Sequence, residues 1–443
     1  MQPMHHPLRG GRIAPRGLAA RRGLAALAAL ALVTSLAACG GDDGTAPTRA
    51  DVPGVTDTEI LVGTHQPLTG PAAPGYSKIA KATEAYFNFV NDAGGVHGRQ
   101  IKYKIMDDTY NPATTQQVVR QLVLQDRVFA MLNGLGTPTH TGVLDFLKAQ
   151  GVPDLFVASG SRNWNQPDKY PHTFGWQTDY TVESKIMATY IKNEHAGKKV
   201  CHFGQNDDFG EDSLAGVEQI LGADALAAKE TYVPTNTNVA PQIGALKAAG
   251  CEVVVLATVP GFTALTLGTA ARLAYRPQWV VSSVGGDYLT LAGRLGAEGT
   301  PLLEGLVSAN YLPSVSETDN PWVQLFRKIN DEYNSGVEFD GNVMYGMAVG
   351  YTFVQALQAA GKDLTREGLI EAVERGGFKG PGLTPFRYSK TDHSGFSGVR
   401  LVVTSNGVQT PVGPVYVTDD GDGPVTEYTE PPTTPPANGV PAP

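Results

Sequence analysis

The chain has 443 residues, of which 42% are hydrophobic, 17% are charged and 8% are aromatic. This length exceeds what one compact core holds and suits two linked lobes, while the composition is that of an ordinary globular protein. The formal net charge of −9 excludes the basic surface that a nucleic-acid-binding protein needs.

The first 38 residues are typical of a secretory signal peptide. Five arginines and no acidic residue precede an apolar run from Leu24 to Ala38. These segments match the charged n-region and the apolar h-region of an export signal. Because the run is too short to span a bilayer comfortably, residues 1–38 are predicted to be removed on export. The arginines are Arg9, Arg12, Arg16, Arg21 and Arg22.

The signal ends in Leu36-Ala37-Ala38-Cys39-Gly40, which resembles the lipobox of bacterial lipoproteins. The resemblance implies that Cys39 is acylated and becomes the first residue of the mature protein. Acyl chains on Cys39 would then anchor the exported protein to the bacterial membrane, at the outer face of the cell membrane or in the periplasm. The alternative is an ordinary secretory signal in which Cys39 is incidental.

Residues 58–418 alternate between strand-like and helix-like segments. The first series of predicted strands lies at 60–63, 101–105, 129–132 and 155–158, and the second at 200–203, 231–233, 253–257 and 279–282. Three later helices near 321–333, 343–360 and 366–375 precede closing strands at 399–403 and 415–418. Strands that alternate with helices predict parallel sheets covered on both faces. Two successive series therefore predict an α/β protein with two lobes.

Two segments outside this pattern lack apolar periodicity. Residues 39–57 are rich in Gly, Asp and Pro and are predicted to form a flexible tether. Residues 419–443 are rich in Asp, Gly, Pro and Thr and are predicted to be a disordered tail without a function.

Cys201 and Cys251 lie in or beside apolar, strand-like segments of the second series. In a doubly wound lobe the first and third strands can be neighbours, which would bring the two Cα atoms within bridging range, below about 7 Å. An exported protein is found where disulfides persist, so a Cys201–Cys251 disulfide is predicted. Two buried free thiols are the alternative.

Several short motifs follow one another in a specific order between residues 58 and 418. They are Pro67-Leu68-Thr69-Gly70-Pro71, Asn91-Asp92-Ala93-Gly94-Gly95, Asp107-Asp108, Gly134-Leu135-Gly136-Thr137 and Asp207-Asp208-Phe209-Gly210. In this order they resemble type I periplasmic binding proteins of the branched-chain amino acid group. The resemblance implies two doubly wound, Rossmann-like lobes that are joined by three crossovers and close on a small ligand.

The resemblance also gives the limits of the two lobes. Lobe 1 is expected to comprise residues 58–178 plus 310–378, and lobe 2 residues 179–309 plus 379–418. The crossovers are placed near residues 176–180, 306–312 and 378–386.

Two loops of the first lobe are expected to bind the ligand, because ligands of open α/β sheets lie beyond the carboxyl ends of strands. Helix N-termini at these ends present free N–H groups that suit a carboxylate. Gly136 and Thr137 follow one predicted strand, and Ser159 and Ser161 follow the next. By resemblance, the matching positions in amino-acid-binding members hold the ligand carboxylate. The alternative is that these residues only cap helices and form turns.

Aromatic side chains are expected to form the walls of the pocket. Phe209 stands where the family often has an aromatic residue from the second lobe, and Trp164 and Tyr76 lie in or near predicted cleft loops. Tyr180, Phe262 and Tyr288 offer further aromatic surface. Each of these residues could instead be core or surface filler.

The ligand is predicted to lack a free amine. Amino-acid-binding members pair the ligand ammonium with an acid in a late loop of the second lobe, and here that position falls on Val284 or Gly285. Burial of an ammonium beside Val would cost on the order of several kcal/mol of binding free energy. Asp287 could supply the acid if the loop were reshaped, although it already suits a helix N-cap. A small carboxylate or amide, aromatic ones included, is therefore favoured over leucine, isoleucine or valine.

The chain lacks the short motifs of common enzymes, such as Gly-x-Ser-x-Gly, His-Glu-x-x-His or a phosphate-binding Gly-x-x-x-x-Gly-Lys. No catalytic residue, metal site or cofactor is predicted. The favoured function is that of a monomeric solute-binding lipoprotein that delivers a small organic ligand to an ABC-type permease. A ligand-sensing lipoprotein for a signalling system is the alternative, and a lipid-anchored enzyme on a similar scaffold is a third, weaker one.

Overall fold

The computed structural model describes residues 52–442. The predicted signal peptide, Cys39 and most of the predicted tether lie outside the described residues. Within the described part, none of the helices is long and apolar enough to cross a membrane.

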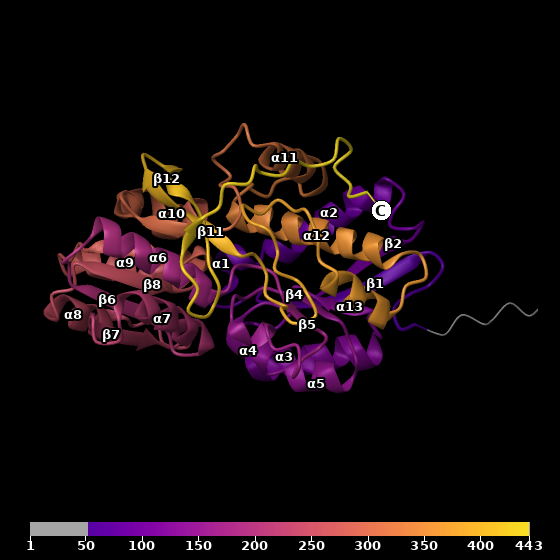
Figure 1. The fold of residues 1–443 in the computed structure, drawn as a ribbon, viewed down its shortest axis with the longest axis horizontal. Coiled ribbons are helices and arrows are strands. Elements are labelled where there is room, and N and C mark those ends of the chain that lie inside the picture. Colours follow the sequence, from indigo (N-terminus) through magenta and orange to yellow (C-terminus); the bar gives the residue numbers. More distant parts are fainter. Residues whose placement is uncertain (1–51, 443) are drawn as a thin grey trace, which may run out of the picture. The chain divides into compact units, whose positions relative to one another are not determined.

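The first sheet, called sheet 1, has five parallel strands in the order β2-β1-β3-β4-β5. Helices α2, α12 and α13 pack together on one face, and α3, α4 and α5 lie over the other (Figure 1). The strands are β1 (Glu59–Gln66), β2 (Gln100–Asp107), β3 (Ala130–Leu132), β4 (Asp154–Val157) and β5 (Thr173–Gly175). The helices are α1 (Ala73–Tyr76), α2 (Ile79–Asp92), α3 (Pro112–Arg120), α4 (Thr137–Thr141), α5 (Leu144–Ala149), α11 (Pro321–Tyr333), α12 (Gly341–Ala360) and α13 (Arg366–Glu374).

The second sheet, called sheet 2, has the order β13-β12-β11-β10-β9-β8-β6-β7. Strands β6 to β10 are parallel, and β11, β12 and β13 add an antiparallel edge. The strands are β6 (Val200–Gln205), β7 (Leu226–Tyr232), β8 (Val253–Ala257), β9 (Gln278–Val281), β10 (Val307–Asn310), β11 (Gly398–Ser405), β12 (Val408–Val417) and β13 (Thr426–Glu427). The helices are α6 (Tyr180–Glu194), α7 (Asp208–Leu221), α8 (Ala240–Ala248), α9 (Pro260–Arg272) and α10 (Tyr288–Gly299).

Strand β8 shows why the sheet is covered on both faces. Its side chains alternate in direction: Val253 and Val255 pack in one core with α6 and α7, while Val254 and Leu256 join the core on the opposite face. Every residue of β8 is buried, as expected for a central parallel strand. These parallel, helix-covered sheets confirm the predicted α/β class.

The chain passes between the two sheets three times. It leaves sheet 1 after β5, returns to the helices of sheet 1 after β10, and enters sheet 2 again between α13 and β11. The aromatic rings of Trp176, Tyr311 and Phe396, one from each crossing region, pack against one another. The three crossing segments therefore share one apolar cluster.

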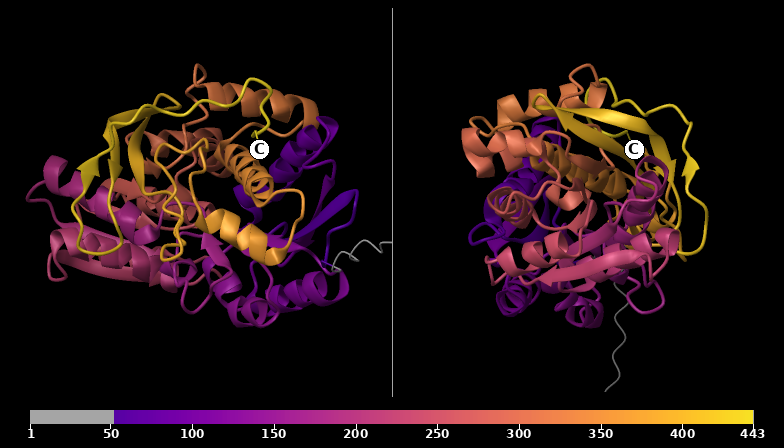
Figure 2. Two further views of the ribbon diagram at one scale, coloured as in Figure 1. Left: turned by 45° about the vertical axis from the view of Figure 1, so that its right-hand side comes forward. Right: turned by 90° about the vertical axis from the view of Figure 1, so that its left-hand side faces the viewer.

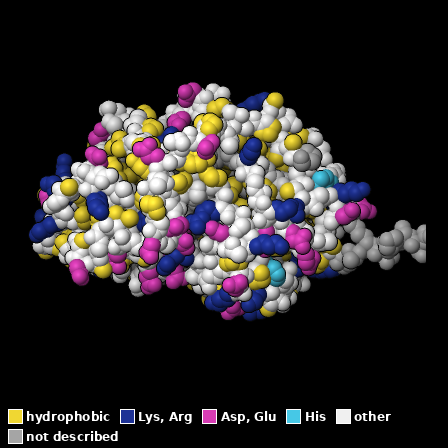
Figure 3. All heavy atoms as spheres, in the orientation of Figure 1, with side chains coloured by type: hydrophobic (Ala, Val, Ile, Leu, Met, Phe, Trp, Pro, Cys, Tyr) yellow, Lys and Arg dark blue, Asp and Glu magenta, His cyan; other side chains and the backbone are white. Residues whose placement is uncertain are grey.

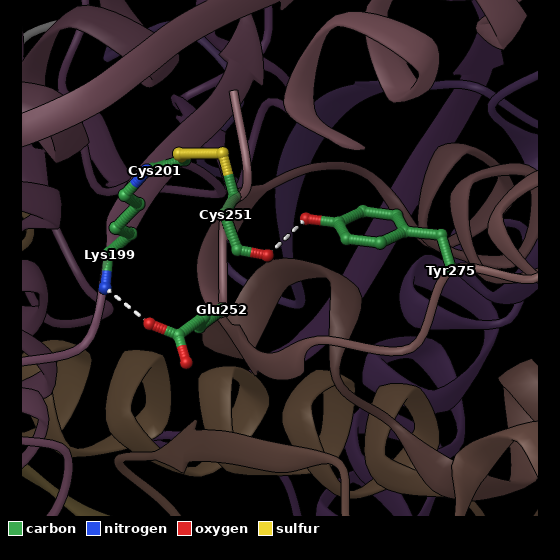
Figure 4. Close-up of a disulfide and its surroundings, with 5 residues drawn as sticks. All are labelled: Lys199, Cys201, Cys251, Glu252 and Tyr275. Carbon is green, nitrogen blue, oxygen red and sulfur yellow. Dashed lines mark hydrogen bonds between the residues drawn. A yellow bond between two sulfur atoms is a disulfide. The ribbon is translucent and has the colours of Figure 1, made fainter. Parts of the chain in front are cut away.

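Cys201 and Cys251 form a disulfide, with their Cα atoms 5.8 Å apart (Figure 4). Cys201 lies on β6 and Cys251 precedes β8, and these strands are neighbours as the sequence predicted. The bridge closes a sequence separation of 50 residues, which in the chain-entropy model stabilises the fold by roughly 4 kcal/mol. Tyr275 donates its hydroxyl proton to the Cys251 carbonyl at 2.9 Å and fixes this corner.

The C-terminal segment differs from the disorder that its composition predicts. Residues 419–427 stay with sheet 2 and end in its edge strand β13, and residues 428–442 then run over the helices beside sheet 1 (Figure 2). The buried ammonium of Lys185 donates to the carbonyl oxygens of Asp419, Gly421 and Gly423 at 2.6–2.9 Å. Further along, Trp322 donates to the Thr433 carbonyl at 2.8 Å and Tyr86 to the Gly439 carbonyl at 2.9 Å. Composition misses this order because the buried donors that require these acceptors lie far away in the sequence.

Removal of residues 419–443 is expected to lower the free energy of unfolding, on the order of 3 kcal/mol, because the Lys185 ammonium loses its oxygen acceptors. The Lys185 side chain is only 2% exposed, so water cannot replace them without local opening. Urea unfolding of the shortened and full chains measures the difference. Combining the truncation with Lys185→Met removes the buried charge and should restore part of the loss. Equal stability of the full and shortened chains would contradict the role of the segment.

Candidate functional site

A cavity of about 120 Å³ lies between the carboxyl ends of the strands in sheets 1 and 2. Sheet 1 contributes loops that follow β2, β3 and β4, and sheet 2 contributes the N-terminus of α7 and the loop after β9. The crossing segment after β10 and the start of α12 complete the wall. The lining side chains that carry the argument below are Tyr76, Tyr110, Thr137, Tyr180, Phe209, Val284, Tyr311 and Tyr345.

The loop after β3 is shaped by Gly136, which precedes α4 and has a φ of 106°. A Cβ atom there would lie 2.5 Å from the Tyr110 ring and from the Thr139 hydroxyl, so only glycine fits. The next residue, Thr137, begins α4 and lines the cavity. Its hydroxyl forms a 2.7 Å hydrogen bond with the hydroxyl of Ser159 from the loop after β4. The two predicted binding loops therefore meet at one point.

Ser161 does not lie in the cavity wall. Its hydroxyl accepts a hydrogen bond from the Asn163 N–H at 3.2 Å and caps a short helical turn. This is the capping role that the sequence left open as an alternative. Of the four predicted loop residues, Gly136 and Thr137 line the cavity and Ser159 supports Thr137 from behind.

The predicted aromatic residues are divided between the cavity and the core. Tyr76 and Phe209 line the cavity. Trp164 instead packs in a small buried cluster, with its ring centre 5.1 Å from that of His140 in an edge-to-face arrangement. Phe262 is buried and stacked on Tyr232 at 4.1 Å. Spacing along the chain could not distinguish these cases, because both kinds of aromatic residue follow strands.

Tyr180 lines the cavity, although the sequence predicted it only as further aromatic surface. Its ring crosses Gly160, where a Cβ atom would lie 2.8 Å from the ring, and contacts Phe209 at a centroid distance of 4.3 Å. Burial raises the pKa of the Tyr180 hydroxyl, while hydrogen bonds from Ser159, the Gly160 N–H and Thr137 oppose that rise. The phenolic oxygen thus lies among the donors that the sequence assigned to a ligand carboxylate.

Three further tyrosines line the cavity but were not among the residues that the sequence predicted there. Tyr110 follows the carboxyl end of β2, so the rule that identified the other loops could have found it. Tyr311 and Tyr345 come from the crossing after β10 and from α12, and their position depends on how the crossings pack. Tyr345 accepts a hydrogen bond from the Asn133 side chain at 2.8 Å.

Both carboxylate oxygens of Asp287 have partners within the protein. One accepts from the Thr290 N–H at 2.8 Å and caps α10. The other accepts from the Gly341 N–H at 2.9 Å, at the first residue of α12. Asp287 lines the cavity, but its carboxylate joins the N-termini of two helices from opposite sides of the cleft. This supports the helix-capping interpretation over an acid that is free to meet a ligand amine.

Other polar contacts cross the cleft at its rim. Arg162, after β4, donates to the Asp212 carboxylate of α7 at 2.8 Å. The neighbouring Asn163 side chain donates to Asp208 at 2.6 Å. Together with the Asp287 contact, these hydrogen bonds hold the two sides against each other.

A buried chain of four side chains supports the sheet 1 loops from below. His65 contacts the Asp108 carboxylate at 2.7 Å and His140 at 2.9 Å, and His140 contacts the Asp154 carboxylate at 2.8 Å. Gly134 lies directly above the two rings, because a Cβ atom there would be 2.5 Å from the His65 ring nitrogen. Among the described residues, no group of three or more His, Cys, Asp and Glu side chains is placed to hold a metal ion.

Glu183 is a fully buried carboxyl group beside the cavity wall. One oxygen accepts a hydrogen bond from the Ser283 N–H at 3.0 Å, and the other has no hydrogen-bond partner. Burial raises the pKa of Glu183 to about 7, against the opposing effect of its hydrogen bonds with Ser283. Glu183 therefore favours its neutral form more strongly than an exposed glutamate does.

The elevated pKa of Glu183 predicts a pH dependence of stability. The folded state holds the proton more tightly than the unfolded chain, so this contribution is fully present below about pH 4.5 and is lost as the pH rises through about 7. The loss is on the order of 3 kcal/mol. In Glu183→Gln the side chain stays neutral, and the unfolding free energy should fall less between pH 5 and pH 8. Asp179, whose pKa is also raised to about 7, is present in both proteins. Its contribution to the pH dependence therefore cancels when the two are compared. Equal pH slopes from denaturant titrations would refute the assignment.

Comparison with known proteins shows one consistent likeness. A family model described as "Periplasmic binding protein" matches residues 59–408. The "Leu/Ile/Val-binding protein homolog 1" of Brucella suis biovar 1 is 24% identical over 330 residues, which cover 72% of this chain and 84% of the relative. The "Leu/Ile/Val-binding protein homolog 2" of Brucella abortus (strain 2308) is 25% identical over 338 residues, which cover 74% and 85%.

Two solved structures share the fold at low sequence identity. A fatty acid ABC transporter substrate-binding protein from Thermomonospora curvata superposes with a TM-score of 0.75 at 22% identity, covering 85% of this chain and 97% of its own. A branched-chain amino acid ABC transporter protein from Thermus thermophilus with bound valine superposes with a TM-score of 0.73 at 21% identity, covering 83% and 98%.

Proposed function

This chain belongs to the periplasmic binding protein family, and we propose that it captures a small organic ligand in the cavity between sheets 1 and 2 and delivers it to an ABC-type importer. The observation that carries the proposal is the cavity itself. It lies at the carboxyl ends of parallel strands and at helix N-termini, where α/β folds bind ligands. The relatives of this chain are binding proteins of transport systems and not enzymes.

The proposed mechanism is closure of two lobes around the ligand. Residues 58–178 plus 310–378 would form lobe 1, and residues 179–309 plus 379–418 would form lobe 2. The rim contacts of Arg162 and Asn163 with α7, and of Asp287 with Gly341, support a closed state. These contacts are few and polar, so their replacement by water on opening costs little.

The proposed ligand is a carboxylate or amide without a free amine. Donors for such a group are present in the Thr137 hydroxyl, which Ser159 supports from behind, and in the tyrosine hydroxyls of the cavity wall. An acceptor for an ammonium is harder to find, because the Asp287 carboxylate is already engaged and Glu183 lies behind Ser283. The solved neighbours are named for a fatty acid and for bound valine, and these two ligands share a carboxylate. The lack of an acceptor for an ammonium favours the carboxylate alone.

The Thr137→Ala variant is expected to bind a carboxylate ligand about 5- to 100-fold more weakly, because a buried, charged partner would lose a hydrogen bond worth roughly 1–3 kcal/mol. Isothermal titration of the purified protein with hits from a thermal-shift screen of small carboxylates and amides measures the affinity. Ser161→Ala is the matched control, since its hydroxyl caps a turn outside the cavity. Equal affinities of wild type and Thr137→Ala would contradict the proposed site. Tight binding of leucine, isoleucine or valine would overturn the proposed ligand class.

We further propose that Cys39 is the lipid-anchored first residue of the mature protein, on the evidence of the Leu36-Ala37-Ala38-Cys39 motif. Expressed in a bacterial host, the native chain should yield an N-terminal peptide that begins at Cys39 and carries acyl chains by mass spectrometry. Cys39→Ser should release the protein from the membrane fraction. An unmodified N-terminus at any residue would disprove the anchor.

A further inference from the structure

A second cavity lies beside the one described above. Its volume is about 270 Å³. Asp287, Ser314, Val315 and Gln409 line both cavities, so the two spaces are separated by no more than these side chains. A ligand that fills the first cavity therefore lies within one side-chain layer of the second.

The walls of the second cavity are largely apolar. Tyr288 and Leu289 contribute from the start of α10, Val315 from the crossing after β10, and Phe339 from the residues before α12. In Figure 3, hydrophobic atoms gather on the surface between α10 and α11. A hollow of this kind that adjoins a ligand site is suited to an apolar group of the ligand.

The charged groups at this cavity argue against a second charge on the ligand. The guanidinium of Arg327 is stacked 4.7 Å above the Phe339 ring and donates to the Val315 carbonyl at 3.0 Å, so it already has partners. Asp287 stands between the two cavities, and Glu338 lies on the outer wall. A ligand with an anion at its far end would have to pass one carboxylate and stop near another.

We propose that the second cavity binds the apolar end of the ligand whose polar end occupies the first cavity. The inference rests on the proposed function and narrows its ligand to monocarboxylates, or their amides, that carry an uncharged chain longer than the side chain of leucine. Each methylene that enters the second cavity should tighten binding about fourfold, the equivalent of about 0.8 kcal/mol.

The test is a calorimetric titration with straight-chain monocarboxylic acids of roughly four, six, eight and ten carbons, so that each acid adds two methylenes of apolar surface to the one before. In the wild type, affinity should rise about fourfold per methylene until the second cavity is full. Leu289→Trp fills that cavity, so it should bind the shortest acid as the wild type does and lose the gain with length. Leu124→Trp changes a leucine that is 54% exposed elsewhere and should keep the full gain.

Ser316→Phe, at a residue that lines the second cavity and not the first, provides a second blocking variant if Leu289→Trp does not fold, which circular dichroism and thermal unfolding show. Affinity that is independent of chain length in the wild type, with the short acids bound, overturns this inference and leaves the proposed function standing. The same holds if both blocking variants retain the full gain with length. Failure of every acid to bind overturns the inference together with the proposed carboxylate class.

Discussion

The cleft loops depend on the buried chain that runs from Asp108 through His65 and His140 to Asp154. Each of these side chains is at most 1% exposed, so every polar atom that lost its partner would carry the cost of an unpaired buried group. The chain begins at the end of β2 and ends on β4, and it passes through β1 and α4. It therefore ties the carboxyl ends of β1 and β2 to α4 and to the start of β4 as one unit. Gly134 can lie on the paired imidazoles only because it lacks a side chain.

This rigid unit explains why sheet 1 can provide a preformed half of the proposed binding site. Thr137 stands one turn before His140 on α4, and the backbone of Tyr110 is tied to Asp108 by a 2.9 Å hydrogen bond from its N–H. Both cavity residues are thus held by the same buried chain. Sheet 2 contributes its half through helix N-caps, with Asp207 before α7 and Asp287 before α10. Groups that are already ordered before binding reduce the conformational entropy that the protein loses when a ligand binds.

Local patterns in the sequence predicted those features that depend on neighbouring residues. Strand and helix alternation and the pairing of Cys201 with Cys251 both follow from spacing and from the rules of parallel sheets. The cavity loops after β3 and β4 were found for the same reason. Trp164, Tyr180 and Glu183 could not be placed, because their surroundings come from distant parts of the chain. The sequence alone does not distinguish a buried glutamate from an exposed glutamate on a helix.

The C-terminal segment shows how such distant contacts constrain motion. It is held to sheet 2 at Lys185 and at β13, and to the helices of sheet 1 at Trp322 and Tyr86. At the Trp322 anchor, the Thr433 hydroxyl also donates to the Gly380 carbonyl at 2.5 Å, within the last segment that crosses between the sheets. A strap that runs beside the crossings lies near the axis about which the two sides would turn, where displacement is smallest. In the proposed closure of the two lobes, the segment can therefore stay bound to both sides while the cleft opens, and its contacts favour rotation about the crossings over separation of the two sheets.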